Sequence, residues 1–448
     1  MASFAGACRI VEIVNESKAD RDELTLFRQR GESAPGWRNK LLWGDNKYIM
    51  ASLLPEFAGK INLIYIDPPF ATGADFYVNI KLGDFELTKE ASVIKEKAYR
   101  DTWGRGLDSY FQMMFDRLVL MRELLADNGS IYVHLDWHVG HYVKLVLDEI
   151  FGKENFRNEI VWCYGGGGAP RNYYHRKHDL LYWYTKSDKW VFNIQYRPYT
   201  EGTLQRGLTK VKGPKYKLRE EGASLDDWWA DITKILSPTA YENLKFPTQK
   251  PEALLERIIN ASSNDGDLVG DFFCGSGTTG AVAEKLGRRW IMADLSKFAI
   301  HTTRKRLLDI PDCKPFEVLN LGKYQKAKLE ENGATRHIDF ILEMEHELKS
   351  KSLSIALKDF VISNPEYLPE EVRENVKKFT DYIDYWAVDF NYRDDTFHNM
   401  WQSFRTRKRP ILETKCSHTY EKADEYKVLV KVVDIFGNDT NKLLEIKV

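Results

Sequence analysis

The stretch IYIDPPF at residues 64–70 places an acid, two prolines and an aromatic residue directly after an apolar run. That run has the composition of a buried strand in a parallel sheet. Pro68 and Pro69 end it, because neither can donate a backbone hydrogen bond to a neighbouring strand. Asp67 and Phe70 are therefore expected at the carboxyl end of the strand, where open α/β sheets bind their ligands.

A glycine-rich turn in DFFCGSGTTG, residues 271–280, is the second feature that could carry chemistry. Gly275, Gly277 and Gly280 match G-x-G-x-x-G between an apolar strand and a helix, and Asp294 ends the next strand, nineteen residues after Gly275. This pattern is typical of a turn that binds an adenosine-bearing cofactor, with the later acid on the ribose hydroxyls. By itself it does not separate a dinucleotide from other cofactors that contain adenosine.

Asp271 favours S-adenosylmethionine over a nicotinamide cofactor. Its carboxylate precedes the first glycine by four residues, where it can meet a cationic amino group. S-adenosylmethionine carries an α-amino group and a sulfonium, whereas a nicotinamide cofactor offers no amino group at that point. Hydride transfer also gives no role to an Asp-Pro-Pro-Phe stretch. We expect S-adenosylmethionine as the cofactor, with a nicotinamide-dependent oxidoreductase as an alternative.

Four motifs together resemble the β-class DNA amino-methyltransferases. They are GDN at 44–46, DPPF at 67–70, FPTQKPEALLERI at 246–258 and DFFCGSGTT at 271–279, within a resemblance that runs from about 41 to 307. The catalytic motif precedes the cofactor turn with a basic insertion between them, as in the modification subunits of type III restriction systems. The resemblance implies methyl transfer from S-adenosylmethionine to the exocyclic N6 of adenine or N4 of cytosine, in a base flipped out of double-stranded DNA.

The resemblance also assigns roles to individual residues. Asp67 and the carbonyl of Pro68 would accept the two hydrogens of the target amine, Pro69 would keep the backbone rigid, and Phe70 would stack on the flipped base. An aspartate at the first motif position accompanies adenine enzymes in this family, which favours N6-adenine over N4-cytosine. The expected cofactor contacts are Asp271 with the amino group, Gly275 and Gly277 with the methionine portion, Phe273 with the cofactor's edge, Asp294 with the ribose, and Thr278 and Lys250 with the methionine carboxylate.

Alternating apolar strands and amphipathic helices surround these motifs and predict a doubly wound α/β sheet. With the resemblance, the expected fold is a Rossmann-like methyltransferase, a mostly parallel twisted sheet with helices on both faces. The predicted organisation is a polar N-terminal arm (1–38), a catalytic half (39–160), a basic target-recognition region (161–245), a cofactor-binding half (246–322), a helical charged connector (323–380) and a C-terminal all-β domain (381–448).

The last part of the chain reads as strands and turns. Val428, Val430 and Val432 alternate onto one face, and Gly-Asn-Asp at 437–439 predicts a hairpin turn. The stretch from 418 to 439 resembles the closing strands of a PKD-type β-sandwich, an immunoglobulin-like domain.

Positive charge is concentrated in one segment although the net charge of the chain is −1. Between Gly165 and Arg219 there are twelve Lys or Arg residues against three acids, interleaved with tyrosines and tryptophans. This is the composition of a surface that contacts DNA phosphates, with a solvated basic face as the alternative. The expected DNA contacts are Arg171, Arg176, Lys177, Arg206, Lys210 and Lys212.

Composition also limits the class of protein. The chain has no run of about 18 uninterrupted apolar residues, so no membrane span is expected. Its first residues become charged too early for a signal peptide. Five cysteines without a CxxC pair predict neither a disulfide framework nor a metal site. A cytoplasmic protein is expected.

Nothing in the sequence resembles a P-loop or a nuclease motif, so any DNA cleavage would need a separate restriction subunit. Double-stranded DNA, that subunit and a second copy of the chain are the expected partners. The alternatives to an adenine enzyme are an N4-cytosine methyltransferase and a catalytically inactive subunit that serves only as the DNA-binding specificity part of a complex.

Overall fold

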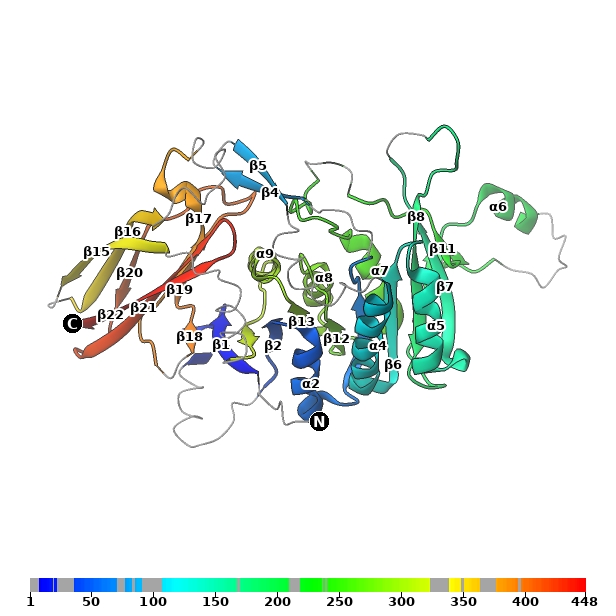
Figure 1. The fold of residues 1–448 in the computed structure, drawn as a ribbon, viewed down its shortest axis with the longest axis horizontal. Helices are drawn as coiled ribbons and strands as arrows, with labels where there is room; N and C mark the ends of the chain where they lie inside the picture. Colours follow the sequence, from blue (N-terminus) through cyan, green and yellow to red (C-terminus); the bar gives the residue numbers. More distant parts are fainter. Residues whose placement is uncertain are drawn as a thin grey trace.

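The molecule consists of an α/β body with a β-sandwich packed beside it (Figure 1). Within the residues that the structure describes, no helix is long and apolar enough to cross a membrane. The structure is a computed structural model, and it describes residues 8–18, 20–21, 36–70, 77–82, 85–90, 107–166, 170–208, 218–235, 237, 240–322, 338–347, 350–362, 376–393 and 396–448.

The described strands of the α/β body form one mixed sheet in the order β11-β7-β8-β6-β3-β12-β13-β2-β14-β1-β18. The run from β6 to β14 is parallel throughout, β8 is antiparallel to both its neighbours, and β1 is antiparallel to β14. The predicted mostly parallel sheet is thus confirmed. Its strands are β1 (Arg9–Val14), β2 (Asn39–Trp43), β3 (Ile61–Ile66), β6 (Leu125–Leu135), β7 (Phe156–Cys163), β8 (His178–Thr185), β11 (Trp228–Trp229), β12 (Leu268–Asp271), β13 (Arg289–Asp294), β14 (Phe316–Asn320) and β18 (Phe397–His398).

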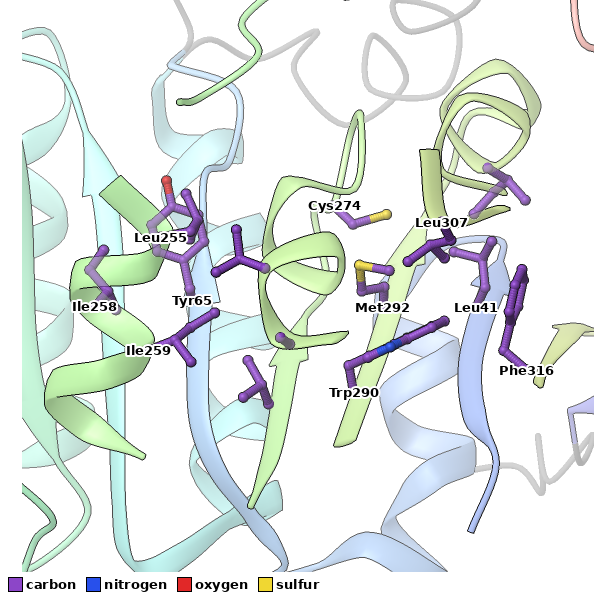
Figure 2. Close-up of a cluster of buried hydrophobic side chains, with 14 of the residues drawn as sticks. Leu41, Tyr65, Leu255, Ile258, Ile259, Cys274, Trp290, Met292, Leu307 and Phe316 are labelled. Carbon is purple, nitrogen blue, oxygen red and sulfur yellow. The ribbon is translucent and has the colours of Figure 1, made fainter. Parts of the chain in front are cut away.

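Helices cover both faces of this sheet, which is why its central strands are apolar on both sides. One face carries α2 (Asn46–Phe57), α4 (Leu107–Leu124) and α5 (Gly140–Phe151). The other carries α7 (Glu252–Ser262), α8 (Thr278–Lys285) and α9 (Lys297–Leu308). Figure 2 shows the core on this second face, where Leu255 and Ile258 of α7 lie beside Tyr65 of β3 and Met292 projects from β13. The remaining elements are η1 (Lys153–Asn155), the hairpin of β4 (Tyr77–Leu82) and β5 (Phe85–Glu90), β9 (Tyr196–Arg197), α6 (Glu201–Leu208) and β10 (Ala223–Ser224).

The region 161–245 is not wholly an insertion. β8 lies between β6 and β7 in the main sheet, and β11 extends the same edge. The predicted strand in this region therefore belongs to the methyltransferase sheet, because its apolar residues Leu181, Tyr182 and Tyr184 are buried there.

The C-terminal body is a sandwich of two antiparallel sheets that share one core. The helical connector predicted at 323–380 is wrong for its described residues, which form two long strands of the sandwich and a short 3-10 helix, η3 (Phe379–Tyr382). Leu353, Ile355 and Leu357 alternate into the core. The many charged residues elsewhere in 323–380 obscure this two-residue period in the sequence. One sheet contains β15 (Ile338–Glu347), β16 (Ser352–Ile362) and β20 (Lys415–Thr419), and the other β19 (Trp401–Phe404), β17 (Ile383–Asp389), β21 (Glu425–Asp434) and β22 (Asp439–Lys447).

The described part of the N-terminal segment contains a strand, β1, where a polar arm was predicted. β1 pairs with β14 and β18, so it joins the main sheet to the C-terminal part of the chain. Glu12 of β1 is fully buried and accepts hydrogen bonds from Arg304 (2.6 Å), Lys431 (2.7 Å) and Asn399 (2.7 Å). Because Lys431 belongs to β21, this buried ion pair ties the two bodies together.

Candidate active site

Three acidic residues meet at the carboxyl edge of the sheet, one from each of three neighbouring strands. Asp67 follows β3, Asp271 ends β12 and Asp294 ends β13, and these parallel strands are adjacent in the order β3-β12-β13. Parallel strands place their carboxyl ends on one edge, the usual ligand-binding edge of such sheets. The DPPF motif and the glycine turn, which are far apart in the sequence, therefore open at the same edge.

Asp67 is held in an ion pair with Lys250. The half-buried carboxylate accepts a hydrogen bond from Nζ of Lys250, which also donates to the backbone oxygen of Thr248 at 3.3 Å. The same Nζ lies 5.5 Å from the centre of the Phe70 ring. The sequence prediction placed Lys250 at the methionine carboxylate of the cofactor, whereas here its ammonium group offers N–H donors to Asp67.

A strained turn brings Lys250 to this position. Thr248 has a backbone φ of 63°, a left-handed value that is rare for a β-branched residue and costs on the order of 1–3 kcal/mol. The turn is fixed by Gln249, whose amide donates to the backbone oxygen of Glu242 (2.6 Å) and accepts from the backbone N–H of Leu244 (2.9 Å). Strain of this kind persists where the surrounding structure holds the residue in a functional position.

A buried polar cluster lies beneath the DPPF turn. The phenol of Tyr65 hydrogen-bonds Nδ1 of His134 (2.8 Å), and Nε2 of His134 lies 3.2 Å from Oδ2 of Asp179. Tyr164 donates to the other oxygen of Asp179 at 2.9 Å. His134 is completely buried, and its ring centre is 6.1 Å from that of Phe70. Sequence reasoning missed this cluster, although a histidine inside the apolar stretch SIYVHLD was a signal for it.

The electrostatics of the cluster follow from its burial. Burial raises the pKa of the Tyr65 phenol well above its ordinary value, and the negative charges of Asp67, Asp271 and Asp179 raise it further. Burial acts to raise the pKa of Asp179 as well, but the hydrogen bond and charge of His134, with the charge of Lys250, outweigh it and leave that pKa below its ordinary value. Tyr65 therefore stays neutral and Asp179 stays ionised.

The glycines of the turn are required by close packing. Gly275 and Gly277 have φ values of 52° and 72°, which glycine adopts without strain. A Cβ on Gly277 would lie 2.6 Å from the side chain of Thr303 on α9. A Cβ on Gly280 would lie 2.0 Å from Met292, so the third glycine lets α8 pack against β13.

Asp294 fixes the start of the turn. One carboxylate oxygen accepts from the backbone N–H of Gly275 (2.9 Å) and the other from that of Ser296 (2.8 Å). Each oxygen of a carboxylate has a second lone pair, so both can still accept from a ligand hydroxyl.

Asp271 is a buried carboxyl group without a cation partner among its hydrogen bonds in the structure. It accepts from the backbone N–H of Phe273 (3.0 Å) and from the hydroxyl of Thr279 (2.5 Å). Burial raises its pKa from the ordinary 3.8 to about 7, and the charges of Asp67 and Asp294 contribute to the rise. A cationic ligand at this edge would relieve that cost, which fits the amino group of S-adenosylmethionine.

Two of the predicted cofactor residues are engaged within the protein. Phe273 is buried in the core on the face of α2 and α4. Thr278 is buried too; its hydroxyl donates to the backbone oxygen of Lys250 (3.2 Å) and accepts from Arg306 (2.8 Å). Thr278 thus connects the glycine turn to the segment that carries Lys250.

The GDN motif at 44–46 holds the backbone that leads into the glycine turn. Asp45 caps α2 by accepting from the backbone N–H of Lys47 (3.0 Å), and the Asn46 amide donates to the backbone oxygen of Phe272 (2.7 Å). Arg117 of α4 hydrogen-bonds both motif side chains. Its role was not predicted, because nothing in the spacing of α4 relates Arg117 to residues 44–46.

The predicted DNA contacts are only partly covered by the described residues. Arg171 and Arg176 are exposed and Lys177 is half-buried, in the segment that joins β7 to β8. Arg206 lies on α6, of which only the backbone is described at that position, and Lys210 and Lys212 lie outside the described residues.

Comparisons with known proteins agree with this geometry. The model of the family described as DNA methylase matches residues 61–305, which is more than half of the chain. The type II methyltransferase M.EcaI of Enterobacter cloacae is 29% identical over 67% of this chain and 76% of its own length. The DNA adenine methyltransferase YhdJ of Escherichia coli K12 is 29% identical over 62% of this chain and 86% of its own.

The Mod subunit of the type III restriction-modification enzyme EcoP15I of Escherichia coli is 31% identical over 34% of this chain and 26% of its own length. The family match spans both the DPPF motif and the glycine turn, the two features that the sheet brings to one edge. The chain therefore belongs to the DNA methylase family, and it is an S-adenosylmethionine-dependent DNA methyltransferase.

Proposed function

We propose that this protein transfers a methyl group to the exocyclic N6 amine of an adenine that is flipped out of double-stranded DNA at a specific sequence. The observation that carries the proposal is the position of Asp67 beside the glycine turn, at the ends of adjacent parallel strands. A base bound at Asp67 and a cofactor bound at Asp271 would thus face the same edge of the sheet. The amine must be extruded, because it is inaccessible inside a stacked duplex.

The DPPF turn would bind the amine. Its nitrogen lone pair is delocalised into the ring, so the amine is a poor nucleophile until hydrogen bonds pull it out of the plane. The carboxylate of Asp67 and the carbonyl of Pro68 would accept the two amine hydrogens. Pro69 restricts the backbone, and Phe70 would stack on the base. Rigid acceptors contribute to rate by orientation, since reacting atoms must approach to about 3–3.5 Å.

Lys250 donates to one oxygen of the Asp67 carboxylate in the base-free enzyme. The carboxylate keeps further lone pairs, so it can accept from the amine of an entering base while Lys250 is bound. A methionine carboxylate, the predicted partner of Lys250, is an anion that could also accept from its ammonium group.

The residues at the glycine turn fit the expected cofactor. S-adenosylmethionine supplies an electrophilic methyl group when it is bound. The Asp271 carboxylate would pair with its amino group, Asp294 would accept from its ribose hydroxyls, and Gly275 and Gly277 let the backbone approach closely. Phe273 is proposed to contribute only its edge to this pocket, since the ring lies in the core.

The choice of adenine rests on Asp67, since an aspartate at this position favours adenine in the family, and on the relative named as an adenine methyltransferase. Mass spectrometry of nucleosides from DNA treated with the purified protein tests it. N6-methyladenine is the expected product. N4-methylcytosine would refute the base assignment, and no methylated base at all would indicate the inactive specificity subunit.

The recognition sequence can be found by long-read sequencing of DNA from cells that express the protein. We propose that part of 161–245 reads that sequence and that Arg171, Arg176, Lys177, Arg206, Lys210 and Lys212 contact DNA. A homodimer and a separate restriction subunit are further proposals, the second supported by the similarity to a type III Mod subunit. Sedimentation analysis tests the first; co-purification with a co-expressed restriction subunit tests the second.

A further inference from the structure

The segment 170–177, which joins β7 to β8, lies at the same edge as Asp67. β8 is antiparallel to β6, so its first residues lie beside the carboxyl end of that strand, with Leu180 opposite Leu135. Ile66, one residue before Asp67, lies opposite Val133 of the same strand. The end of the segment that adjoins β8 therefore lies only a few residues beyond the level of Asp67, on the order of 10 Å along the strand direction.

This segment is cationic and carries an unusually exposed aromatic side chain. It contains Arg171, Arg176 and Lys177 and no acidic residue. Tyr174 is 97% exposed and Tyr173 is 61% exposed, whereas the aromatic residues of the adjoining strands β7 and β8 are largely buried. A single exposed tyrosine is common on protein surfaces. An exposed tyrosine in a cationic segment beside an expected DNA site indicates a contact with DNA.

The base of the segment is fixed by stacking. The guanidinium of Arg176 lies 3.9 Å from the centre of the Trp137 ring and 5.4 Å from that of Tyr173. The Trp137 ring in turn contacts that of His138 in a tilted arrangement (3.7 Å between ring centres), and His138 hydrogen-bonds the buried Asp136, which follows β6. Tyr174 thus projects from a backbone that is anchored within two residues by a cation–π contact.

We propose that Tyr174 enters the DNA base stack in the place left by the flipped base, while Arg176, held on Trp137, binds an adjacent phosphate. The inference rests on the proposed function. Extruding a base breaks pairing and stacking, and an aromatic side chain inserted into the gap restores part of the stacking. Arg176 would neutralise the charge of a DNA phosphate. Because its side chain is already held on Trp137, it loses little conformational freedom on binding.

The test compares Tyr174→Ala and Tyr174→Phe with the control Trp190→Ala. Trp190 resembles Trp137, because both are 39% exposed and the guanidinium of Arg157 lies 3.8 Å from the centre of the Trp190 ring. This pair lies at the opposite edge of the sheet, beyond the other end of β8. Methylation is measured on two duplexes that contain the recognition sequence. In one the target adenine is paired with thymine, and in the other it faces an abasic site, so that little pairing opposes extrusion.

Tyr174→Ala is expected to lower kcat/KM on the paired duplex about tenfold to a hundredfold. On the duplex with the abasic site it should stay within about threefold of the wild type, because extrusion there costs little. Tyr174→Phe keeps the ring and should behave like the wild type, as should Trp190→Ala. The fluorescence of 2-aminopurine at the target position should rise less with Tyr174→Ala than with the wild type.

An equal loss on both duplexes, or no loss on either, would overturn the assignment of Tyr174. A wild-type protein that methylates neither duplex would instead refute the proposed function, so the two failures are distinguishable. Normal affinity of Tyr174→Ala for S-adenosylmethionine confirms that the variant is folded.

Discussion

Replacing Asp271 by asparagine should stabilise the protein without cofactor and remove most of its affinity for S-adenosylmethionine. The asparagine keeps both hydrogen bonds, because its amide oxygen can accept from the backbone N–H of Phe273 and its amide can donate to the hydroxyl of Thr279. What it removes is a buried carboxyl group whose charged form is disfavoured by burial. The same charge is what the amino group of the cofactor is expected to need.

The magnitude follows from the pKa of Asp271, which is about 7 in the folded protein against an ordinary value of 3.8. The folded state holds this proton more tightly than the unfolded state, so its stability falls as pH rises from about 4 through 7. Each pKa unit corresponds to about 1.36 kcal/mol, which gives a total cost of about 4 kcal/mol above pH 7. At pH 5 only about 1.5 kcal/mol of this cost is present.

The assay is urea unfolding of wild type and Asp271→Asn at pH 5 and pH 8, without cofactor. The variant should be more stable at both pH values, with a difference that is larger by about 2–3 kcal/mol at pH 8. Calorimetry should also show wild-type affinity for S-adenosylmethionine falling up to tenfold for each pH unit below 7. A variant that is less stable than wild type at pH 8, or that binds the cofactor normally, would refute the reasoning.

Three further changes test other contacts of the structure. Asp67→Ala should abolish methyl transfer and leave the Kd for S-adenosylmethionine, measured by calorimetry, largely unchanged; near-normal turnover would contradict the role of its carboxylate. Glu12→Gln leaves two buried cations without their carboxylate partner and should lower the free energy of unfolding by about 3–5 kcal/mol, as chemical denaturation would show. Gly437→Ala would place a Cβ 3.0 Å from Cα of Phe298, near the start of α9, and should weaken cofactor binding. Gly266→Ala has a similar φ, 77° against 83°, with no atom within 4 Å, so equal effects of the two would exclude the clash as the cause.

The two bodies are joined more closely than the sequence indicated. Lys297, at the start of α9, pairs with Asp439 (2.8 Å), and both His301 (2.8 Å) and Lys305 (2.7 Å) of the same helix pair with Asp384 of the sandwich. Because α9 begins three residues after Asp294, the sandwich packs against the helix next to the acid that we propose to bind the cofactor ribose. These contacts are what the Gly437→Ala prediction tests.

Local chemistry was enough to locate the two motifs. Prolines end a strand and glycines permit a tight turn whatever surrounds them, so DPPF and GSGTTG could be placed at strand ends from the sequence. The apolar runs between them predicted a mostly parallel sheet, because strands covered on both faces are apolar throughout. These features depend on residues that are close in sequence and on the regular spacing of side chains along helices and strands.

Partners across the fold could be decided only by the tertiary structure. The strands at 338–362 were taken for helix because the segment is rich in charged residues, and only packing against the second sheet shows which face is buried. The ammonium group of Lys250 pairs with Asp67, 183 residues away in the sequence, a contact that the sequence did not indicate. His134 and Asp179 meet because β6 and β8 are adjacent strands. Side-chain pairing of this kind depends on sheet order, which the spacing of residues along the chain does not specify.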